Sequence, residues 1–286
     1  MDEPVTDTLD VPGARLHLET RGAGPLLLFV VGGNGDSAIY GGVAAALADR
    51  FTVATYDRRG FARSPLLAPI EDDARIDADA DDARRLIAHL GGGPAHVFGS
   101  SSGAIVVLEL VARHPEVVVT AVAHEPPIAT LLPDSAEWLA FFDSVQETYR
   151  AEGLWPAMAR FGAAVGSGGA AGGPPPDVEL PQSVVEMMAR VETNMTFWME
   201  HELRQYPRYV PDLDALGAAR DRIVPAGGQE SREHMPYRPN LVLAERLGLQ
   251  VVDFVGDHVG YATHPAEFAS QLGALLTGPG SVRPGR

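Results

Sequence analysis

The pattern of hydrophobic and polar positions predicts a chain in which strands and helices alternate. Residues 26–31 form a continuous apolar run between Gly-Pro and Gly-Gly pairs, which is typical of a strand buried on both faces. Residues 6–20 contain two alternating stretches around Pro12-Gly13, which predicts a hairpin. Further strands are expected at 51–56, 95–98, 117–123, 223–226 and 250–255. Helices are expected at 44–50, 76–90, 103–113, 239–247 and 265–276. This alternation favours an α/β fold with a mostly parallel sheet.

The alternation stops between residues 127 and 219, where mainly helical patterns occur. They are interrupted at 166–176 by a stretch rich in Gly, Ala and Pro. The strand and helix alternation resumes at residue 220. We therefore expect one α/β core formed by residues 1–126 and 220–286, with a helical cap or lid inserted at 127–219.

Composition and charge exclude several classes of protein. The net charge of −16 disfavours nucleic acid and anionic membranes as partners, because an acidic surface repels phosphate. The chain contains no cysteine and no lysine, which excludes thiolate nucleophiles, Schiff bases and P-loops. No apolar run is long enough to span a membrane, and the first residues do not resemble a signal peptide. We expect a cytoplasmic protein that acts on a small molecule. Its oligomeric state stays open, with a homodimer among the options.

The sequence Gly99-Ser100-Ser101-Ser102-Gly103 matches the pattern G-x-S-x-G between a short strand and an apolar helix. A strand that turns abruptly into a helix crowds its central residue, so glycine fits two positions away on either side. This context predicts Ser101 as a nucleophile exposed above the sheet. The N–H of Ser102, at the start of the helix, would stabilise a developing oxyanion.

His258 is the candidate general base. It lies in Gly256-Asp257-His258-Val259-Gly260, directly after the last predicted strand and before the last helix. A catalytic triad in the order serine, acid, histidine needs its base in this loop.

Two carboxylates compete as the acid that orients His258. Glu230 is the first carboxylate after the strand at 223–226, and that segment contains no aspartate. Glu125 ends the strand that follows the serine helix, at the edge of the sheet where ligand sites gather. We favour Glu230 from its place in the order of the fold and keep Glu125 as the alternative.

The glycine-rich loop after residue 31 supports two interpretations. With Ser101 as the nucleophile, a backbone N–H of Gly33 or Asn34 completes the oxyanion hole. The same loop also fits G-x-G-x-x-G/A, with Asp57 at the end of the next strand where a ribose-binding carboxylate would lie. An NAD- or FAD-dependent oxidoreductase is therefore an alternative, although it leaves the serine turn and His258 unexplained.

These features together resemble the α/β-hydrolase superfamily. The segment 56–64 is similar to the family's segment after its fourth strand, and 256–276 to its histidine loop and closing helix. The resemblance implies an eight-stranded, mostly parallel sheet with a lid inserted after the sixth strand. The chain departs from the family twice. Gly32-Gly33 replaces the usual His-Gly of the oxyanion loop, and a glutamate replaces the usual triad aspartate.

The type of nucleophile narrows the reaction. Members of this fold that cleave haloalkanes and epoxides have aspartate at the central position, whereas Ser101 indicates acyl transfer on an ester, lactone or thioester. Among the Met and aromatic residues of the insertion, Trp155, Met195 and Trp198 are candidates for binding a small to medium apolar substrate. We expect neither a metal nor a cofactor. A ligand binder or a cofactor-free, non-hydrolytic catalyst on the same fold is the other alternative.

Overall fold

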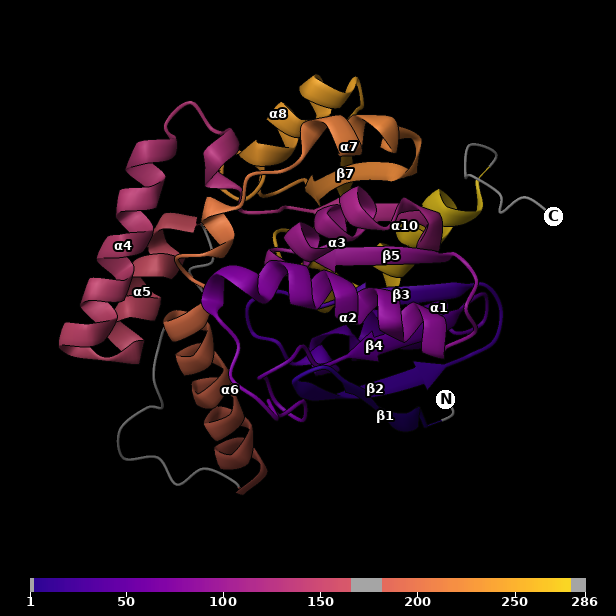
Figure 1. Cartoon of the computed structure of the whole chain (residues 1–286), viewed down its shortest axis with the longest axis horizontal. Helices are drawn as coiled ribbons and strands as arrows, with labels where there is room; N and C mark the ends of the chain where they lie inside the picture. The colour runs from indigo at the N-terminus through magenta and orange to yellow at the C-terminus, as the bar shows by residue number, and fades with distance from the viewer. Residues whose placement is uncertain (1–2, 166–181, 279–286) are drawn as a thin grey trace.

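An eight-stranded sheet forms the centre of the molecule in the computed structural model, which describes residues 3–165 and 182–278 (Figure 1). The stretch 166–176 therefore lies outside the described residues. The strand order is β1-β2-β4-β3-β5-β6-β7-β8. The strands are β1 (Val5–Val11), β2 (Ala14–Arg21), β3 (Leu26–Val30), β4 (Thr52–Tyr56), β5 (Ala95–Ser100), β6 (Val118–His124), β7 (Ile223–Gly228) and β8 (Val252–Phe254). The hairpin β1-β2 pairs antiparallel, β2 pairs antiparallel with β4, and the other pairs are parallel. The predicted fold class is confirmed.

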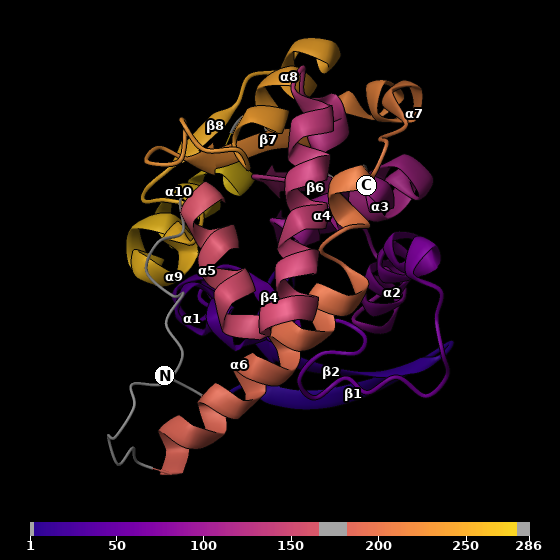
Figure 2. The same cartoon turned by 90° about the vertical axis from the view of Figure 1, so that its left-hand side faces the viewer.

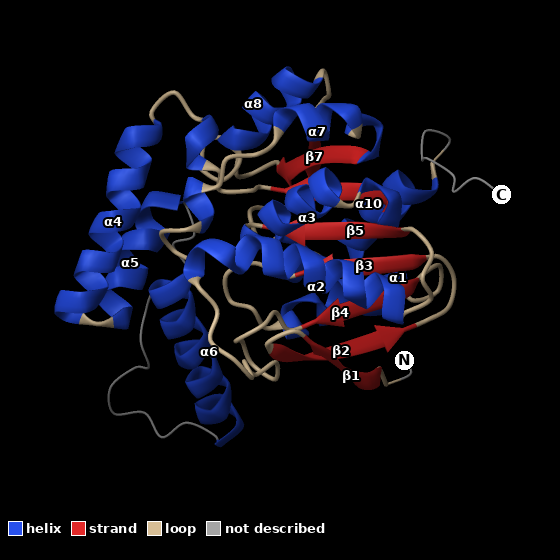
Figure 3. Cartoon of the chain, viewed as in Figure 1, coloured by secondary structure: helices blue, strands red, loops and turns tan. Residues whose placement is uncertain are grey.

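Helices cover both faces of the sheet (Figure 3). Alternate residues of β3 enter different cores: Leu28 and Val30 pack on one side, and Leu27 and Phe29 on the other. The first core includes residues of α2 (Arg75–His89), α3 (Ser102–Arg113), α7 (Leu213–Ala218) and α8 (Arg238–Leu247). The second includes residues of α1 (Gly41–Leu47), α9 (Gly260–Thr263) and α10 (Pro265–Thr277). Burial on both faces explains why the central strands are almost wholly apolar.

The chain between β6 and β7 is helical. Its three long helices are α4 (Ser135–Glu152), α5 (Leu154–Val165) and α6 (Gln182–His201). They lie beyond the ends of the parallel strands, on the side to which the arrowheads of β5 and β7 point, and cross that edge of the sheet (Figures 2 and 3). A third apolar cluster joins them to the core, with Phe142, Trp198 and Met199 from the helices and Phe61 and Met235 from core loops. These helices therefore form a roof over the carboxyl ends of the strands.

The predicted strands and helices of the core are confirmed, with shifts of a few residues at their ends. The last strand is shorter than expected, at Val252–Phe254, and the first helix begins earlier, at Gly41. None of the helices in the described part of the chain is long and apolar enough to cross a membrane.

Candidate active site

Ser101 occupies the turn between β5 and α3 in a backbone conformation that L-residues rarely adopt, with φ 57° and ψ −127°. Its N–H donates to the carbonyl of His124 at the end of β6, at 2.9 Å, which ties the turn to the neighbouring strand. Ser102 is the first residue of α3, so its N–H is one of the four at the helix start that no helical carbonyl accepts. The turn thus places a hydroxyl next to a free backbone donor.

The two glycines of the turn have no space for a side chain. A Cβ on Gly99 would come within 2.3 Å of the Gly103 carbonyl oxygen, and a Cβ on Gly103 within 2.2 Å of the Val30 oxygen. The expected crowding on either side of the serine is therefore present, and it involves backbone atoms that cannot move aside.

The carboxylate that contacts His258 belongs to Glu125. His258 Nδ1 lies 2.5 Å from Glu125 Oε2, and the backbone N–H of Gly228 donates to Oε1 at 2.7 Å. The preference for Glu230 as the carboxylate that orients His258 is wrong, because the Glu230 side chain is exposed. Its backbone N–H donates to Gly256 O. The Glu125 carboxylate passes close to Gly227 in β7. A Cβ on Gly227 would lie 3.2 Å from Glu125 Oε1.

Glu125 is buried and ionised. Burial alone would raise its pKa, but the hydrogen bond and charge of His258, with further contributions from His124 and the Gly228 N–H, lower the pKa to about 2. An ionised carboxylate can only accept hydrogen bonds, so Nδ1 of His258 carries the proton and Nε2 is the basic nitrogen. This tautomer is the one that a general base beside Ser101 requires.

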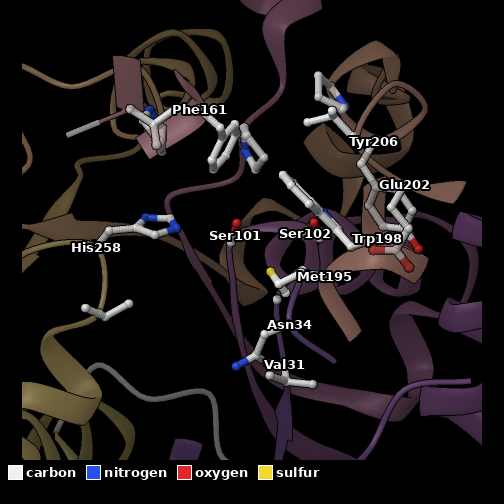
Figure 4. A pocket seen from close by; sticks show the side chains of 18 of the residues that line it. Val31, Asn34, Ser101, Ser102, Phe161, Met195, Trp198, Glu202, Tyr206 and His258 are labelled. Carbon is white, nitrogen blue, oxygen red and sulfur yellow. The ribbon is translucent and has the colours of Figure 1, made fainter. Parts of the chain in front are cut away.

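His258 and Ser101 line the same cavity, and the imidazole of His258 lies to one side of Ser101 (Figure 4). Within residues 3–165 and 182–278, the Ser101 hydroxyl forms no hydrogen bond with His258. Such contacts are often long without a bound substrate and shorten when the reacting complex forms.

The loop after β3 lies against the nucleophile. A Cβ on Gly32 would come within 3.0 Å of the Ser101 Cβ, so only glycine permits this approach. The carbonyl of Gly32 accepts from Arg58 Nη2 and from the Gly35 N–H, each at 3.0 Å. Because a trans peptide is planar, anchoring this carbonyl also fixes the direction of the Gly33 N–H. The Asn34 side chain forms a hydrogen bond within the loop, because its Oδ1 accepts from the Asp36 N–H at 3.1 Å.

Asp57 is not available to a nucleotide ribose. Its side chain is fully buried and accepts hydrogen bonds from Ser37 and Arg63. The dinucleotide interpretation of the glycine loop therefore lacks the free carboxylate that it needs. No cluster of three His, Asp or Glu side chains is arranged to hold a metal ion in the described part of the chain.

A mostly apolar cavity of about 180 Å³ opens above Ser101. Met195 and Trp198, two of the candidate substrate-binding residues, line it, whereas Trp155, the third, is not among its lining residues. Glu202 and Tyr206 also line the cavity, and the sequence analysis missed them. The signal for Glu202 was its spacing of four residues from Trp198, because positions four apart share a helix face.

Comparisons with known proteins agree with this fold. The family model for the alpha/beta hydrolase fold matches residues 25–169. The uncharacterized hydrolase YraK of Bacillus subtilis (strain 168) is 38% identical over 94% of this chain and 95% of its own length. Zearalenone hydrolase of Bionectria ochroleuca is 28% identical over 93% and 95%. The structure of the enol-lactonase from Burkholderia xenovorans LB400 superposes with a TM-score of 0.67 at 16% identity and covers 95% of this chain and 100% of that one.

The chain belongs to the α/β-hydrolase fold family and is an α/β-hydrolase enzyme.

Proposed function

We propose that the enzyme hydrolyses an acyl bond, in an ester, lactone or thioester, through Ser101, His258 and Glu125. The observation that carries this proposal is the 2.5 Å contact between His258 and the buried Glu125, in the same cavity as a serine held in a strained turn. Two relatives that match over nearly their whole length are named hydrolases, which supports a hydrolytic reaction.

Each group has a defined role in the proposed reaction. Nε2 of His258 takes the proton of Ser101 as Oγ attacks the acyl carbon, and the backbone N–H groups of Ser102 and of Gly33 or Asn34 stabilise the oxyanion. The C–O or C–S bond then breaks, and His258 gives its proton to the leaving group. Water attacks the acyl-enzyme with His258 again as the base, which releases the acid and restores Ser101. Glu125 stabilises the imidazolium in both steps.

The cavity favours a small to medium apolar substrate. Phe142, Met158, Phe161 and Met195 form much of its wall, and methionine adapts its shape to different ligands. Apolar walls also exclude water around the oxyanion, which strengthens its hydrogen bonds.

Turnover of p-nitrophenyl esters tests the proposal. We expect wild-type enzyme to release nitrophenol with a burst that matches the concentration of active sites, because nitrophenolate leaves readily and acylation is then faster than hydrolysis of the acyl-enzyme. Ser101→Ala should lose at least about 10³-fold in kcat while keeping its fold by circular dichroism. Full activity in Ser101→Ala would overturn the mechanism. A folded wild-type enzyme with no turnover of any ester would instead favour a ligand binder on this fold.

A further inference from the structure

A free backbone donor lies beside the nucleophile. A Cβ on Gly32 would come within 3.0 Å of the Ser101 Cβ and 3.7 Å of its Oγ, and Gly33 lines the cavity together with Ser101. Within the described ranges 3–165 and 182–278, the N–H of Gly33 donates to no acceptor. The direction of this N–H therefore decides whether it can meet the oxyanion.

The residues around this donor form a turn that closes on itself. The N–H of Gly35 donates to the carbonyl of Gly32 at 3.0 Å, which is the bond of a β-turn over residues 32–35. This bond fixes the shape of the turn, but it does not fix how the turn lies against Ser101. Contacts from outside the turn must set that placement.

Arg58 contacts both ends of this turn. Its backbone N–H donates to the Gly35 carbonyl at 3.1 Å, and its side-chain Nη2 donates to the Gly32 carbonyl at 3.0 Å. The C=O and N–H of one trans peptide point in opposite directions. The bond to Gly32 therefore directs the Gly33 N–H away from Arg58, and the positive charge of the guanidinium makes this bond stronger than a neutral one.

Two carboxylates fix the guanidinium of Arg58 in turn. Nη1 and Nη2 donate to Oε1 and Oε2 of Glu202 at 2.9 and 2.7 Å, and Nη1 also donates to Asp79 Oδ2 at 2.7 Å. All three side chains are buried, and the guanidinium carbon lies 4.9 Å from the ring centre of Phe61. Because the guanidinium is a rigid planar fork, these partners together allow it one orientation.

Glu202 connects this arrangement to the roof of the cavity. It directly follows α6, and its N–H donates to the carbonyl of Trp198 in that helix at 2.9 Å. Asp79 lies in α2 of the core. The contacts therefore run from the roof and the core, through Arg58, to the peptide that carries the free N–H.

We propose that Arg58 is a positioning residue for the oxyanion hole and that Glu202 of the roof holds it in place. Arg58 is fully buried and acts through the Gly32–Gly33 peptide, not on the reacting atoms. The oxyanion hole is then complete only when the roof is packed on the core. This inference rests on the proposed hydrolysis and adds to it a residue that directs one of the two backbone donors.

Esters that differ only in the carbonyl atom report on the oxyanion hole. The probes are p-nitrophenyl acetate and p-nitrophenyl thionoacetate, in which sulfur replaces the carbonyl oxygen. Sulfur is a weak hydrogen-bond acceptor, so its reaction gains little from the N–H groups. We expect wild-type kcat/KM, divided by the rate with hydroxide, to favour the oxygen ester by at least about tenfold, since one oxyanion donor contributes about 10²- to 10³-fold. Release of nitrophenol with enzyme in excess measures both reactions, even when turnover is slow.

Arg58→Met removes the guanidinium and keeps an unbranched side chain. We expect kcat/KM for the oxygen ester to fall by about 10- to 100-fold, and the oxygen-to-sulfur ratio by at least about fivefold, because a misdirected N–H loses part of its contribution. Arg59→Met is the matched control and should keep the wild-type ratio. Arg59 is buried and pairs with Asp82 at 2.7 and 2.6 Å, and none of its hydrogen bonds in the described part of the chain reaches residues 32–35.

Glu202→Gln tests the part played by the roof. The amide keeps the shape of the carboxylate but presents an NH₂ group to a guanidinium that can only donate. We expect the oxygen-to-sulfur ratio to fall by about two- to tenfold, because Arg58 loses half of its fork-to-fork pair. Asp82→Asn is the matched control, since it makes the same change in a buried carboxylate that pairs with Arg59, and it should keep the wild-type ratio.

Circular dichroism checks that each variant folds. If Arg58→Met does not fold, Arg58→Lys takes its place. Its ammonium keeps the charge but cannot replace the planar fork between Glu202 and Gly32, so the oxygen-to-sulfur ratio should still fall by at least about threefold.

Three results would overturn the inference. They are a wild-type enzyme without a preference for the oxygen ester, an unchanged ratio in the folded Arg58 variant, and equal falls in the Arg58 and Arg59 variants. An unchanged ratio in Glu202→Gln would contradict the part assigned to the roof. Failure of a fluorophosphonate to label Ser101 would reject the proposed function, and this inference with it.

Discussion

At the scale of single residues, Glu125 combines three features that suit a triad acid. It has a positive φ of 51°, it is fully buried, and its pKa is lowered to about 2. The strained backbone is maintained because the N–H of Glu125 donates to Ala226 O and its carboxylate bonds to both Gly228 and His258. The residue is thus fixed from the backbone to the carboxylate.

Exchanging the two candidate acids for amides distinguishes them by activity. We expect Glu125→Gln to lower kcat by about 10²- to 10⁴-fold, because the amide can stabilise the wrong tautomer of His258 and cannot stabilise the imidazolium. Glu230→Gln is the matched control and should retain wild-type kcat, because its side chain is exposed. Steady-state ester kinetics measure both, and a loss confined to Glu230→Gln would reverse our assignment.

His124 makes stability depend on pH. Its side chain is fully buried, and burial lowers its pKa from 6.5 to about 4. Between these values the unfolded chain binds a proton that the folded chain does not. The contribution of His124 is therefore complete above pH 6.5 and decreases as the pH falls towards 4. We expect a loss of up to about 3 kcal/mol in the free energy of unfolding across this range.

The variant His124→Asn isolates this contribution. Denaturant unfolding at a series of pH values should show a smaller decrease for the variant than for wild type between pH 6.5 and 4. Other groups titrate in this window, including Asp82, whose pKa burial raises to about 6, but they are common to both proteins. Identical pH dependence in the two proteins would show that His124 is not the titrating group.

At the scale of elements, the serine turn depends on the contact between β3 and α3. A Cβ on Gly103 would meet the backbone oxygens of Val30 and Val31 at 2.2 and 2.7 Å, so Gly103→Ala should lower the free energy of unfolding by about 1–3 kcal/mol or more. Gly217 in α7 has no atom within 4 Å of the corresponding position. Gly217→Ala should therefore be neutral or stabilise by up to about 1 kcal/mol. Equal effects of the two substitutions in denaturant unfolding would contradict this account.

The elements of the core could be predicted because their signals are local. The apolar run at 26–31, the Pro12-Gly13 turn and the glycines around Ser101 each determine structure through their immediate neighbours in sequence. Strand ends were less accurate, since they depend on pairing. β8 has three residues because its pairing with β7 ends at Phe254.

The partner of His258 could not be predicted from order along the chain. Order indicates which loop follows which strand, but Glu125 reaches His258 across β7, past Gly227. The absence of an aspartate directly after β7 and the presence of a glutamate directly after β6 were the available signs. Arg58 and Glu202 were missed for a similar reason, since their hydrogen bonds join residues far apart in sequence.

At the scale of the whole molecule, a cluster of buried ion pairs connects the helical region to the sheet. It consists of Arg58, Arg59 and Arg75 paired with Asp79, Asp82 and Glu202. Arg58 follows β4 and bonds to Asp79 in α2, to Glu202 after α6 and to the carbonyl of Gly32 beside Ser101. One guanidinium therefore contacts the roof of the cavity, the core and the loop next to the nucleophile.

Replacing Arg58 should lower the free energy of unfolding. Arg58→Met leaves buried carboxylates without their cation, and we expect a loss of about 3–5 kcal/mol in the free energy of unfolding. Arg15→Met is the matched control, because Arg15 and Asp10 form an ion pair with side chains that are 53% and 66% exposed. Its loss should be at most about 1 kcal/mol. Denaturant unfolding of both variants measures the difference, and a similarly small loss in Arg58→Met would show that the cluster does not join the two regions.

The central claim is that Ser101 is the nucleophile. Labelling with a fluorophosphonate, followed by mass spectrometry of the digested protein, tests it most directly. We predict one adduct on the peptide that contains Ser101, at wild-type rates in Glu230→Gln, slowed in Glu125→Gln, and absent in Ser101→Ala. An adduct on another residue, or none on a folded wild-type enzyme, would contradict the account.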